Sequence, residues 1–429
     1  MERNSSRRSF LKGSALTGAA YVLGRRVLAR SNPLSVIVVG AGAFGGWTAL
    51  ELLRKGAKVV LVDAWGPGNS RASSGGETRI IRATYGPSRI YTQMAVQALR
   101  LWQENEQRWG LKLFFPTGVL WMTGQDDSYE RAALPLLRDA GVRLEKLAAS
   151  DCAKRWPQIK FAEISWSIYE PDFGFLAARR CCEAVFNAFL KEGGEYRQAQ
   201  AAPGRITGNR MEGIILTPGE SLTADAYVFA CGPWLGTVFS FLGSLIRATR
   251  QEVFFLGTAA GDVRFTDAQL PVWIDNSRRA EHLYYGIPGN HWRGFKIADD
   301  TRGPVVDPTT MERQISAAGL AAARRYVSMR FPGLADAPLL ESRVCQYENS
   351  ADQNFILDRH PEAANVWIVG GGSGHGFKHG PAIGKLVSEA VLGIKAPPAE
   401  FLLGRLVTSV LRLSHSRTPP TVSFSQAVV

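Results

Sequence analysis

Cysteine is scarce in this chain, and its placement suits neither a disulfide framework nor a metal centre. The five cysteines of the 429 residues are Cys152, Cys181, Cys182, Cys231 and Cys345. An odd number in so long a chain leaves at least one thiol unpaired. The sequence has no CxxC pair and no histidine cluster with metal-ligand spacing, so we predict that the protein binds no metal. At least one cysteine is therefore available for another task.

Long hydrophobic runs and basic clusters are also missing. The small and apolar stretch 13–24 is too short to cross a bilayer, which takes roughly 20 residues. The net charge of +12 is scattered instead of gathered into a basic run interleaved with aromatics, so we predict no nucleic-acid partner. The positive excess favours small anionic substrates. With 45% hydrophobic and 21% charged residues, the composition is that of a soluble globular enzyme with two or three structural units.

The first 29 residues have the pattern of an export signal. Arg7 and Arg8 lie in a positively charged region before the apolar run, and a small-residue ending suits cleavage after Ala29. The segment SRRSFLK resembles the twin-arginine signal, which implies that the twin-arginine translocase exports the protein already folded, to the periplasm or beyond. Membrane contact is expected only through this segment, if it is not cleaved. A basic, disordered N-terminus is the alternative.

The next segment, SVIVVGAGAFGGWTALELLRKGAKVVLVDA, has the order of a dinucleotide-binding βαβ unit. A β-branched strand at Ser35 to Val39 leads into GxGxxG, a helix is expected over 47–55, and a second strand at 58–62 ends in Asp63. The glycines permit a tight turn, a close approach to pyrophosphate and close helix packing, while Asp63 accepts a ribose hydroxyl. The predicted cofactor-binding residues here are Gly40, Gly42, Ala43, Phe44, Gly45 and Asp63. The motif alone leaves NAD and FAD open.

Further motifs favour FAD. These are GETRIIR at 76–82, YYGIPG at 284–289, GFKIADD at 294–300, VCQYENSADQNFILDRHP at 344–361 and SGHGFKHGPAIG at 373–384. With their order in the chain, they make it similar to the sarcosine oxidase and N-methyl amino acid oxidase branch of the D-amino acid oxidase superfamily. The resemblance runs from about residue 35 to residue 403.

The resemblance implies an α/β fold with a Rossmann-like FAD-binding domain of the glutathione-reductase type. The FAD domain is expected to be discontinuous, over 33–115, 174–250 and 337–400. Segments 116–173 and 251–336 are expected to form an α+β substrate domain built on a mixed sheet. Helices are expected near 176–190 and 381–392, and a strand at 366–369. The tail, 407–429, carries no motif and is expected to be poorly ordered. We expect a monomer.

The resemblance also implies how FAD is held. Cys345 matches the position where the family attaches flavin through a thioether, a reaction that needs a thiolate nucleophile. A buried structural cysteine is the alternative. Arg79 matches an arginine beside the flavin ring, where positive charge assists hydride acceptance. The other cofactor-binding residues implied are Gly76, Thr78, Gly232, Gly372, Gly374 and Lys378.

Substrate and oxygen residues follow from the same motifs. Arg82 and Lys378 match a clamp for the carboxylate of an amino acid, and a surface ion pair is the alternative for each. Lys296 matches the lysine that activates O2, with a solvated lysine on a strand as the alternative. Tyr285 and Tyr347 match active-site tyrosines, although aromatic residues in strands are often only core.

Two positions depart from the family pattern. Sarcosine oxidases commonly have histidine where this chain has Gly75 and where it has Asp300. A carboxylate at Asp300 is expected to pair with a second cationic group of a substrate, or to repel sarcosine itself. The identity of the substrate therefore stays open, although the resemblance implies the type of reaction.

The function expected from this resemblance is FAD-dependent oxidation of the C–N bond of an amino acid, with a secondary amine as substrate and O2 reduced to H2O2. Three alternatives stay open. One is a dehydrogenase of the same fold that passes electrons to a quinone, another is a non-catalytic flavin-binding subunit, and the least favoured is an NAD-dependent dehydrogenase.

Overall fold

The computed structural model describes residues 32–278, 281–289 and 293–406. The predicted export signal and the predicted tail after residue 406 lie outside these ranges. None of the described helices is long and apolar enough to cross a membrane.

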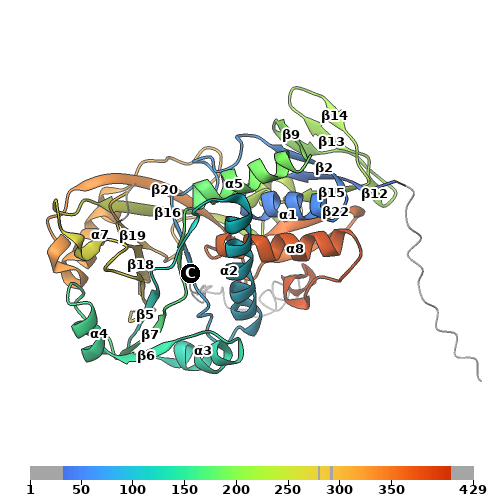
Figure 1. Cartoon of the computed structure of the whole chain (residues 1–429). Helices are drawn as coiled ribbons and strands as arrows, with labels where there is room; N and C mark the ends of the chain where they lie inside the picture. The colour runs from blue at the N-terminus through green and yellow to red at the C-terminus, as the bar shows by residue number, and fades with distance from the viewer. Residues whose placement is uncertain (1–31, 279–280, 290–292, 407–429) are drawn as a thin grey trace, which may run out of the picture. The chain divides into compact units, whose positions relative to one another are not determined.

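A six-stranded sheet carries the predicted βαβ unit (Figure 1). Its pairs are parallel except β21 with β22. Val38, at its centre, lies opposite Leu61 on one side and Val228 on the other. Strands buried on both faces explain the nearly continuous apolar runs of the sequence. In sheet order the strands are β21 (Ile356–His360), β22 (Ala363–Gly370), β15 (Ala226–Phe229), β1 (Ser35–Val39), β2 (Lys58–Asp63) and β9 (Glu195–Gln198).

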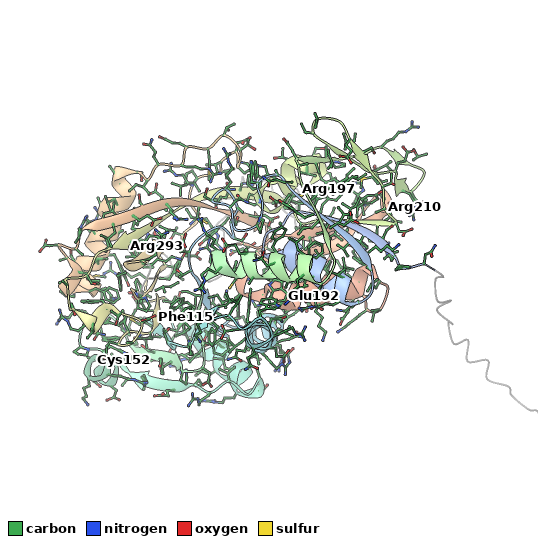
Figure 2. The ribbon with its side chains drawn as sticks, turned by 45° about the horizontal axis from the view of Figure 1, so that its top comes forward. Phe115, Cys152, Glu192, Arg197, Arg210 and Arg293 are labelled. Carbon is green, nitrogen blue, oxygen red and sulfur yellow. The ribbon has the colours of Figure 1, made fainter. Side chains whose placement is uncertain are left out.

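Helix α1 (Ala43–Arg54) packs against this sheet, and α8 (Gly380–Val391) lies beside α1 (Figure 1). Glycine makes the close approach possible, because a Cβ on Gly384 would lie 2.7 Å from the backbone of Trp47. Helix α5 (Ala178–Lys191) packs on α1. Glu192, labelled in Figure 2, follows the end of α5. Arg54, the last residue of α1, pairs with Glu192 at 2.7 Å.

A second sheet has eight strands and is mixed, since β5 and β17 are parallel and the other neighbours antiparallel. Its two longest strands, β16 and β20, begin within segments that the sequence assigned to the FAD domain. In sheet order the strands are β20 (Leu339–Ser350), β16 (Ile246–Leu256), β19 (Phe295–Asp299), β18 (Tyr284–Ile287), β17 (Val272–Asp275), β5 (Val119–Thr123), β7 (Trp166–Glu170) and β6 (Glu145–Ala148).

Smaller elements connect these layers. The other helices are α2 (Arg89–Trp109), α3 (Ser128–Asp139), α4 (Ala149–Arg155), α6 (Leu235–Val238) and α7 (Ala317–Arg330). One small sheet joins β3 (Arg79–Ile81), β8 (Gly174–Leu176) and β4 (Phe114–Phe115). Two others are formed by β10 (Ala201–Pro203), β13 (Ile214–Leu216) and β14 (Ser221–Leu222), and by β11 (Ile206–Thr207) with β12 (Arg210–Met211).

The predicted α/β fold class with a mixed sheet is confirmed, and so are the strands at 35–39, 58–62 and 366–369. Two helix starts were wrong. The first helix begins at Ala43 instead of residue 47, because the last glycine of the motif, Gly45, and its neighbour Gly46 lie in the first turns of the helix. The helix expected from residue 176 begins at Ala178, because Leu176 pairs with Arg79 and Phe114 in a strand. The predicted domain boundaries stay a prediction.

Adjacent glycines on α1 provide a test of this packing. A Cβ on Gly45 would lie 1.8 Å from the carbonyl oxygen of Gly40, whereas a Cβ on Gly46 would make only ordinary contacts, with Val185 at 3.5 Å and the backbone of Ala41 at 3.7 Å. We expect Gly45→Ala to lower the free energy of unfolding by about 1–3 kcal/mol. We expect Gly46→Ala to be neutral or stabilising by up to about 1 kcal/mol, because alanine favours the helix. Denaturant unfolding measures both, and equal effects would contradict the packing described.

Candidate active site

An elongated cavity opens at the carboxyl ends of β1 and β2, where α/β sheets commonly bind ligands. Its lining includes Gly40, Gly42, Ala43, Phe44, Asp63, Trp65, Ser73, Ser74, Arg79, residues 199–203, Cys231, Gly232, Trp234, Thr309, Tyr347, Glu348, Gly372 and Gly374. Most of the predicted cofactor-binding residues therefore line one cavity. The exceptions, Gly45, Gly76, Thr78, Cys345 and Lys378, lie behind or beside it.

The glycine turn shapes one end of the cavity. Gly40 has φ +106°, and a Cβ there would lie 2.3 Å from the carbonyl oxygen of Ala230, so only glycine fits. Gly42 precedes the first residue of α1 and faces Ser74 across the cavity. The N-terminus of α1 thus presents backbone amides and positive potential to the cavity, which suits a pyrophosphate.

Asp63 is held by the backbone. Its carboxylate accepts hydrogen bonds from the amides of Ala41 at 2.7 Å, Trp65 at 2.8 Å and Gly66 at 2.7 Å. Burial raises the pKa of Asp63, and these hydrogen bonds oppose the shift. A carboxylate has about four acceptor positions, so one remains for a ribose hydroxyl. The backbone amides at the N-terminus of α1 and the carboxylate of Asp63 thus supply the donors and the acceptor that the pyrophosphate and ribose of FAD require.

Arg79 joins the loop after β2 to strand β20. Its guanidinium donates to the carbonyl oxygens of Ser73 at 2.6 Å and Thr78 at 2.8 Å, and Nη2 lies 3.5 Å from Cys345 Sγ. A Cβ on Gly76 would lie 2.2 Å from Arg79 Nη1, so glycine at 76 is what seats the guanidinium. A flavin ring held here would contact a fixed cation, and a thiolate at Cys345 would be paired with it.

Lys296 lies behind the same loop. It is 2% exposed, and its Nζ donates to the carbonyl oxygen of Thr78 at 3.0 Å. Burial lowers the pKa of Lys296 well below its ordinary value, and the neighbouring charge of Arg79 lowers it further. The alternative of a solvated lysine on a strand was therefore wrong.

The two predicted tyrosines meet beside this cluster. The ring of Tyr285 lies 5.5 Å from Lys296 Nζ, and burial raises the pKa of Tyr285 to about 12. Tyr347 donates from its hydroxyl to Asp300 Oδ1 at 2.8 Å. The other oxygen of Asp300 pairs with Arg302 at 2.9 Å. Lys296, Tyr285, Arg79, Cys345, Tyr347 and Asp300 thus form one connected cluster.

Arg82 and Lys378 are both buried, at 0% and 2% exposure, which excludes the alternative of surface ion pairs. The guanidinium of Arg82 lies 4.3 Å from the ring of Tyr85 and 4.9 Å from that of Trp121, and it donates to the carbonyl oxygen of Thr84. Lys378 Nζ donates to the Tyr85 hydroxyl at 2.9 Å. The two cations therefore share one aromatic neighbour.

Lys378 also interacts electrostatically with two carboxylates of the site, Asp300 and Glu170, and Arg82 interacts with Glu170. Burial lowers the pKa of Lys378 well below its ordinary value and Arg82 lowers it further, while Asp300 and Glu170 raise it. Glu170 is buried and accepts the amides of Ala83 at 2.7 Å and Thr84 at 2.9 Å. It thereby fixes the backbone that follows Arg82.

Gly75, one of the two departures from the family pattern, has a structural reason. A Cβ there would lie 1.8 Å from the carbonyl oxygen of Asn69. The tight loop between Asn69 and Gly75 therefore excludes a side chain at this position. Gly232, with φ +55°, and Gly374, with φ +82°, occupy left-handed backbone that glycine adopts readily.

Sequence reasoning missed Tyr85, Trp121, Glu170 and Arg302. Trp121 and Glu170 lie on β5 and β7, remote in sequence from the motifs, and no local pattern marks them. Arg302 has a weak signal, since it follows Asp300 by two residues. In the described part of the chain no three His, Cys, Asp or Glu side chains gather as metal ligands.

Comparison with known proteins gives the family of this fold and site. The pattern of the FAD dependent oxidoreductase family, DAO, matches residues 35–390. The chain belongs to this family. FAD is thus its cofactor, and it is an oxidoreductase of the sarcosine oxidase type.

Monomeric sarcosine oxidase of Bacillus sp. (strain B-0618) is 31% identical over 381 residues, covering 84% of this chain and 93% of that protein. N-methyl-L-tryptophan oxidase of Salmonella enteritidis PT4 is 26% identical over 363 residues, covering 83% and 94%. Among solved structures, Amadoriase I of Aspergillus fumigatus aligns with a TM-score of 0.75 at 20% identity, covering 89% and 91%. L-proline dehydrogenase from P. horikoshii aligns with a TM-score of 0.74 at 19% identity, covering 86% and 96%. The two structural likenesses concern the fold alone.

Two cysteines near the cavity allow a controlled test of flavin attachment. Cys345 contacts Arg79, whereas Cys231 lines the cavity but burial raises its pKa, which keeps it a thiol. After acid precipitation we expect the yellow colour to stay with the protein in the wild type and in Cys231→Ala, and to pass into the supernatant in Cys345→Ala. Colour released from the wild type would make Cys345 a structural cysteine.

Proposed function

We propose that this enzyme oxidises the C–N bond of an amino acid that carries a secondary amine, such as an N-methyl amino acid, and passes the electrons to O2 to give H2O2. The observation that carries the proposal is the buried pair of cations, Arg82 and Lys378, which share Tyr85 as a neighbour. Lys378 also lies within electrostatic reach of Asp300, the partner of Tyr347 in the cofactor cavity. Relatives named for the oxidation of sarcosine and N-methyl-L-tryptophan support the same reaction class.

The cationic pair suits a substrate carboxylate. Arg82 offers a planar fork of donors and Lys378 a compact charge. The two positive charges repel each other, so each raises the free-energy cost of burying the other. An anionic ligand bound between them would lower that cost. The aromatic faces of Tyr85 and Trp121 exclude water from Arg82, so a carboxylate bound there gains from a low local dielectric.

When bound, FAD supplies a hydride acceptor. The protein's own groups orient the substrate toward it and keep water out. Arg82 and Lys378 anchor the carboxylate, and Tyr285 and Tyr347 stay neutral because burial raises the pKa of both phenols. Arg79, held beside Cys345, would supply positive charge to a bound flavin ring. The imine product leaves the site and hydrolyses in solvent. In its protonated form, Lys296 would provide a buried positive charge for O2 as O2 gains electrons.

A variant pair tests this function. In anaerobic mixing with a panel of N-methyl amino acids, we expect wild-type flavin to bleach and Lys378→Met to bind these substrates about 10- to 100-fold more weakly, because a charged hydrogen bond is lost. Lys385→Met, at an exposed position of α8, the helix that follows Lys378 in the chain, serves as the control. Carboxylate binding should also weaken as pH rises through the lowered pKa of Lys378, since only the charged lysine attracts an anion.

Other outcomes would change the assignment. If no amine bleaches the wild-type flavin, the chain is a non-catalytic flavin-binding subunit. If bleaching occurs but a quinone reoxidises the flavin quickly and O2 slowly, the enzyme is a dehydrogenase. If Lys385→Met weakens binding as much as Lys378→Met, the carboxylate clamp is wrong.

We also propose that the protein is exported by the twin-arginine route, which carries folded proteins with their cofactor loaded. The support is the sequence SRRSFLK before a short apolar run. We expect Arg7→Lys/Arg8→Lys to leave the full-length precursor in the cytoplasmic fraction, with Arg25→Lys/Arg26→Lys exported normally. Cell fractionation and immunoblotting measure this, and export of both double variants would refute the twin-arginine assignment.

A further inference from the structure

Both oxygens of Asp300 already have a partner within the protein. It is 3% exposed, its Oδ2 pairs with Arg302 at 2.9 Å, and its Oδ1 accepts from the Tyr347 hydroxyl at 2.8 Å. The expectation that Asp300 meets a second charge on the substrate stays a prediction, and these contacts point to a role for Asp300 within the protein. Its carboxylate acts within the protein, on Tyr347.

Arg302 makes this carboxylate rigid. Its guanidinium donates to the carbonyl oxygen of Ser373 at 2.7 Å, to Gln353 Oε1 at 3.1 Å and to the backbone oxygen of Asp300 at 2.8 Å. It also lies 5.1 Å from the ring of Tyr347. Ser373 belongs to the glycine-rich loop that leads to Lys378. The ion pair thus fixes the end of β19 against the loop that carries the substrate clamp.

The hydrogen of the Tyr347 hydroxyl is committed to Asp300. Burial raises the pKa of Asp300, but the ion pair with Arg302 and the hydrogen bond from Tyr347 oppose the shift and favour a carboxylate, which only accepts. Burial, and then the charge of Asp300, raise the pKa of Tyr347 well above its ordinary value, so the phenol stays neutral. A phenol that donates its proton to Asp300 presents only its lone pairs elsewhere, and the neighbouring Tyr285 shares a hydrogen bond with it.

Tyr347 faces the reaction site. It follows Cys345 by two residues on β20, so both side chains lie on one face of the strand, and Tyr347 lines the cofactor cavity. Lys378 lies within electrostatic reach of Asp300, the partner of Tyr347. A substrate whose carboxylate is held by Lys378 has its nitrogen one carbon away from that carboxylate.

We propose that Asp300, held by Arg302, is a positioning residue that fixes the Tyr347 hydroxyl as a hydrogen-bond acceptor for the substrate nitrogen, so that the site selects amino acids whose nitrogen carries a hydrogen. This inference rests on the proposed function. It assigns primary and secondary amines as substrates, and it disfavours tertiary amines, whose neutral form has no N–H to donate.

The test compares Tyr347→Phe, Asp300→Asn and the double variant, with Asp299→Asn as control, because Asp299 pairs instead with His282, at 2.7 Å. Two readouts are needed in the flavin-loaded protein. One is the rate constant for anaerobic flavin reduction by N-methylglycine and by N,N-dimethylglycine. The other is the dissociation constant of propionate, a carboxylate without nitrogen, from flavin absorbance.

We expect Tyr347→Phe and Asp300→Asn each to slow flavin reduction by N-methylglycine about 10-fold, which is equivalent to the loss of one hydrogen bond. The ratio of the rate constants for N-methylglycine and N,N-dimethylglycine should fall in both variants. The double variant should be no slower than Tyr347→Phe, because Asp300 acts through Tyr347. Propionate binding should be unchanged in all variants. Asp300→Glu, which keeps the acceptor, should restore part of the rate.

Multiplicative losses in the double variant, or equal losses for propionate and N-methylglycine, would overturn the inference. An unchanged rate constant of flavin reduction in Tyr347→Phe would also overturn it. This variant leaves the ion pair of Asp300 and Arg302 intact, so it tests the inference even if Asp300→Asn fails to fold. Failure of the proposed function gives a different result. In that case no amine would reduce the wild-type flavin, while propionate binding could still be measured.

Discussion

The contact between the Arg79 guanidinium, two carbonyl oxygens of its own loop and the sulfur of Cys345 is the interaction on which the site depends. It connects the loop that follows the first βαβ unit to β20, the edge strand of the other large sheet. The Arg79 side chain therefore holds its loop at a fixed distance from β20, the strand that carries Cys345 and Tyr347. Lysine at this position would lack the fork that reaches two carbonyl groups and a sulfur at once.

Buried charge is the second constraint. Arg82, Lys296 and Lys378 are almost fully enclosed, and burial lowers the pKa of both lysines. Such groups cost stability unless they are paired and hydrogen-bonded. The carboxylates of Glu170 and Asp300 offset part of the cost. Burial of this kind at one end of a cavity is typical of a site organised for an anionic ligand and for charge that develops during reaction.

The sequence was most informative where chemistry and local structure coincide. The glycine turn, both strands of the βαβ unit and the helix after residue 380 follow from short-range pattern, and the structure has them there. Cys345, Arg82 and Lys296 came from the resemblance, and the structure adds their burial and contacts. Trp121, Glu170 and Arg302 were missed because they act through contacts between β5, β7, β19 and the loops that carry Arg82 and Ser373. Long-range packing of this kind leaves no periodic signal along the chain.

The central claim is that Arg79 positions the flavin. It is tested most directly by the flavin content of purified Arg79→Lys, measured as the ratio of visible to protein absorbance in samples whose unfolding curve matches the wild type. The account predicts a folded protein with flavin content reduced severalfold and no acid-stable colour, because the loop is no longer tied to Cys345. A variant with the full wild-type content of acid-stable flavin would contradict it.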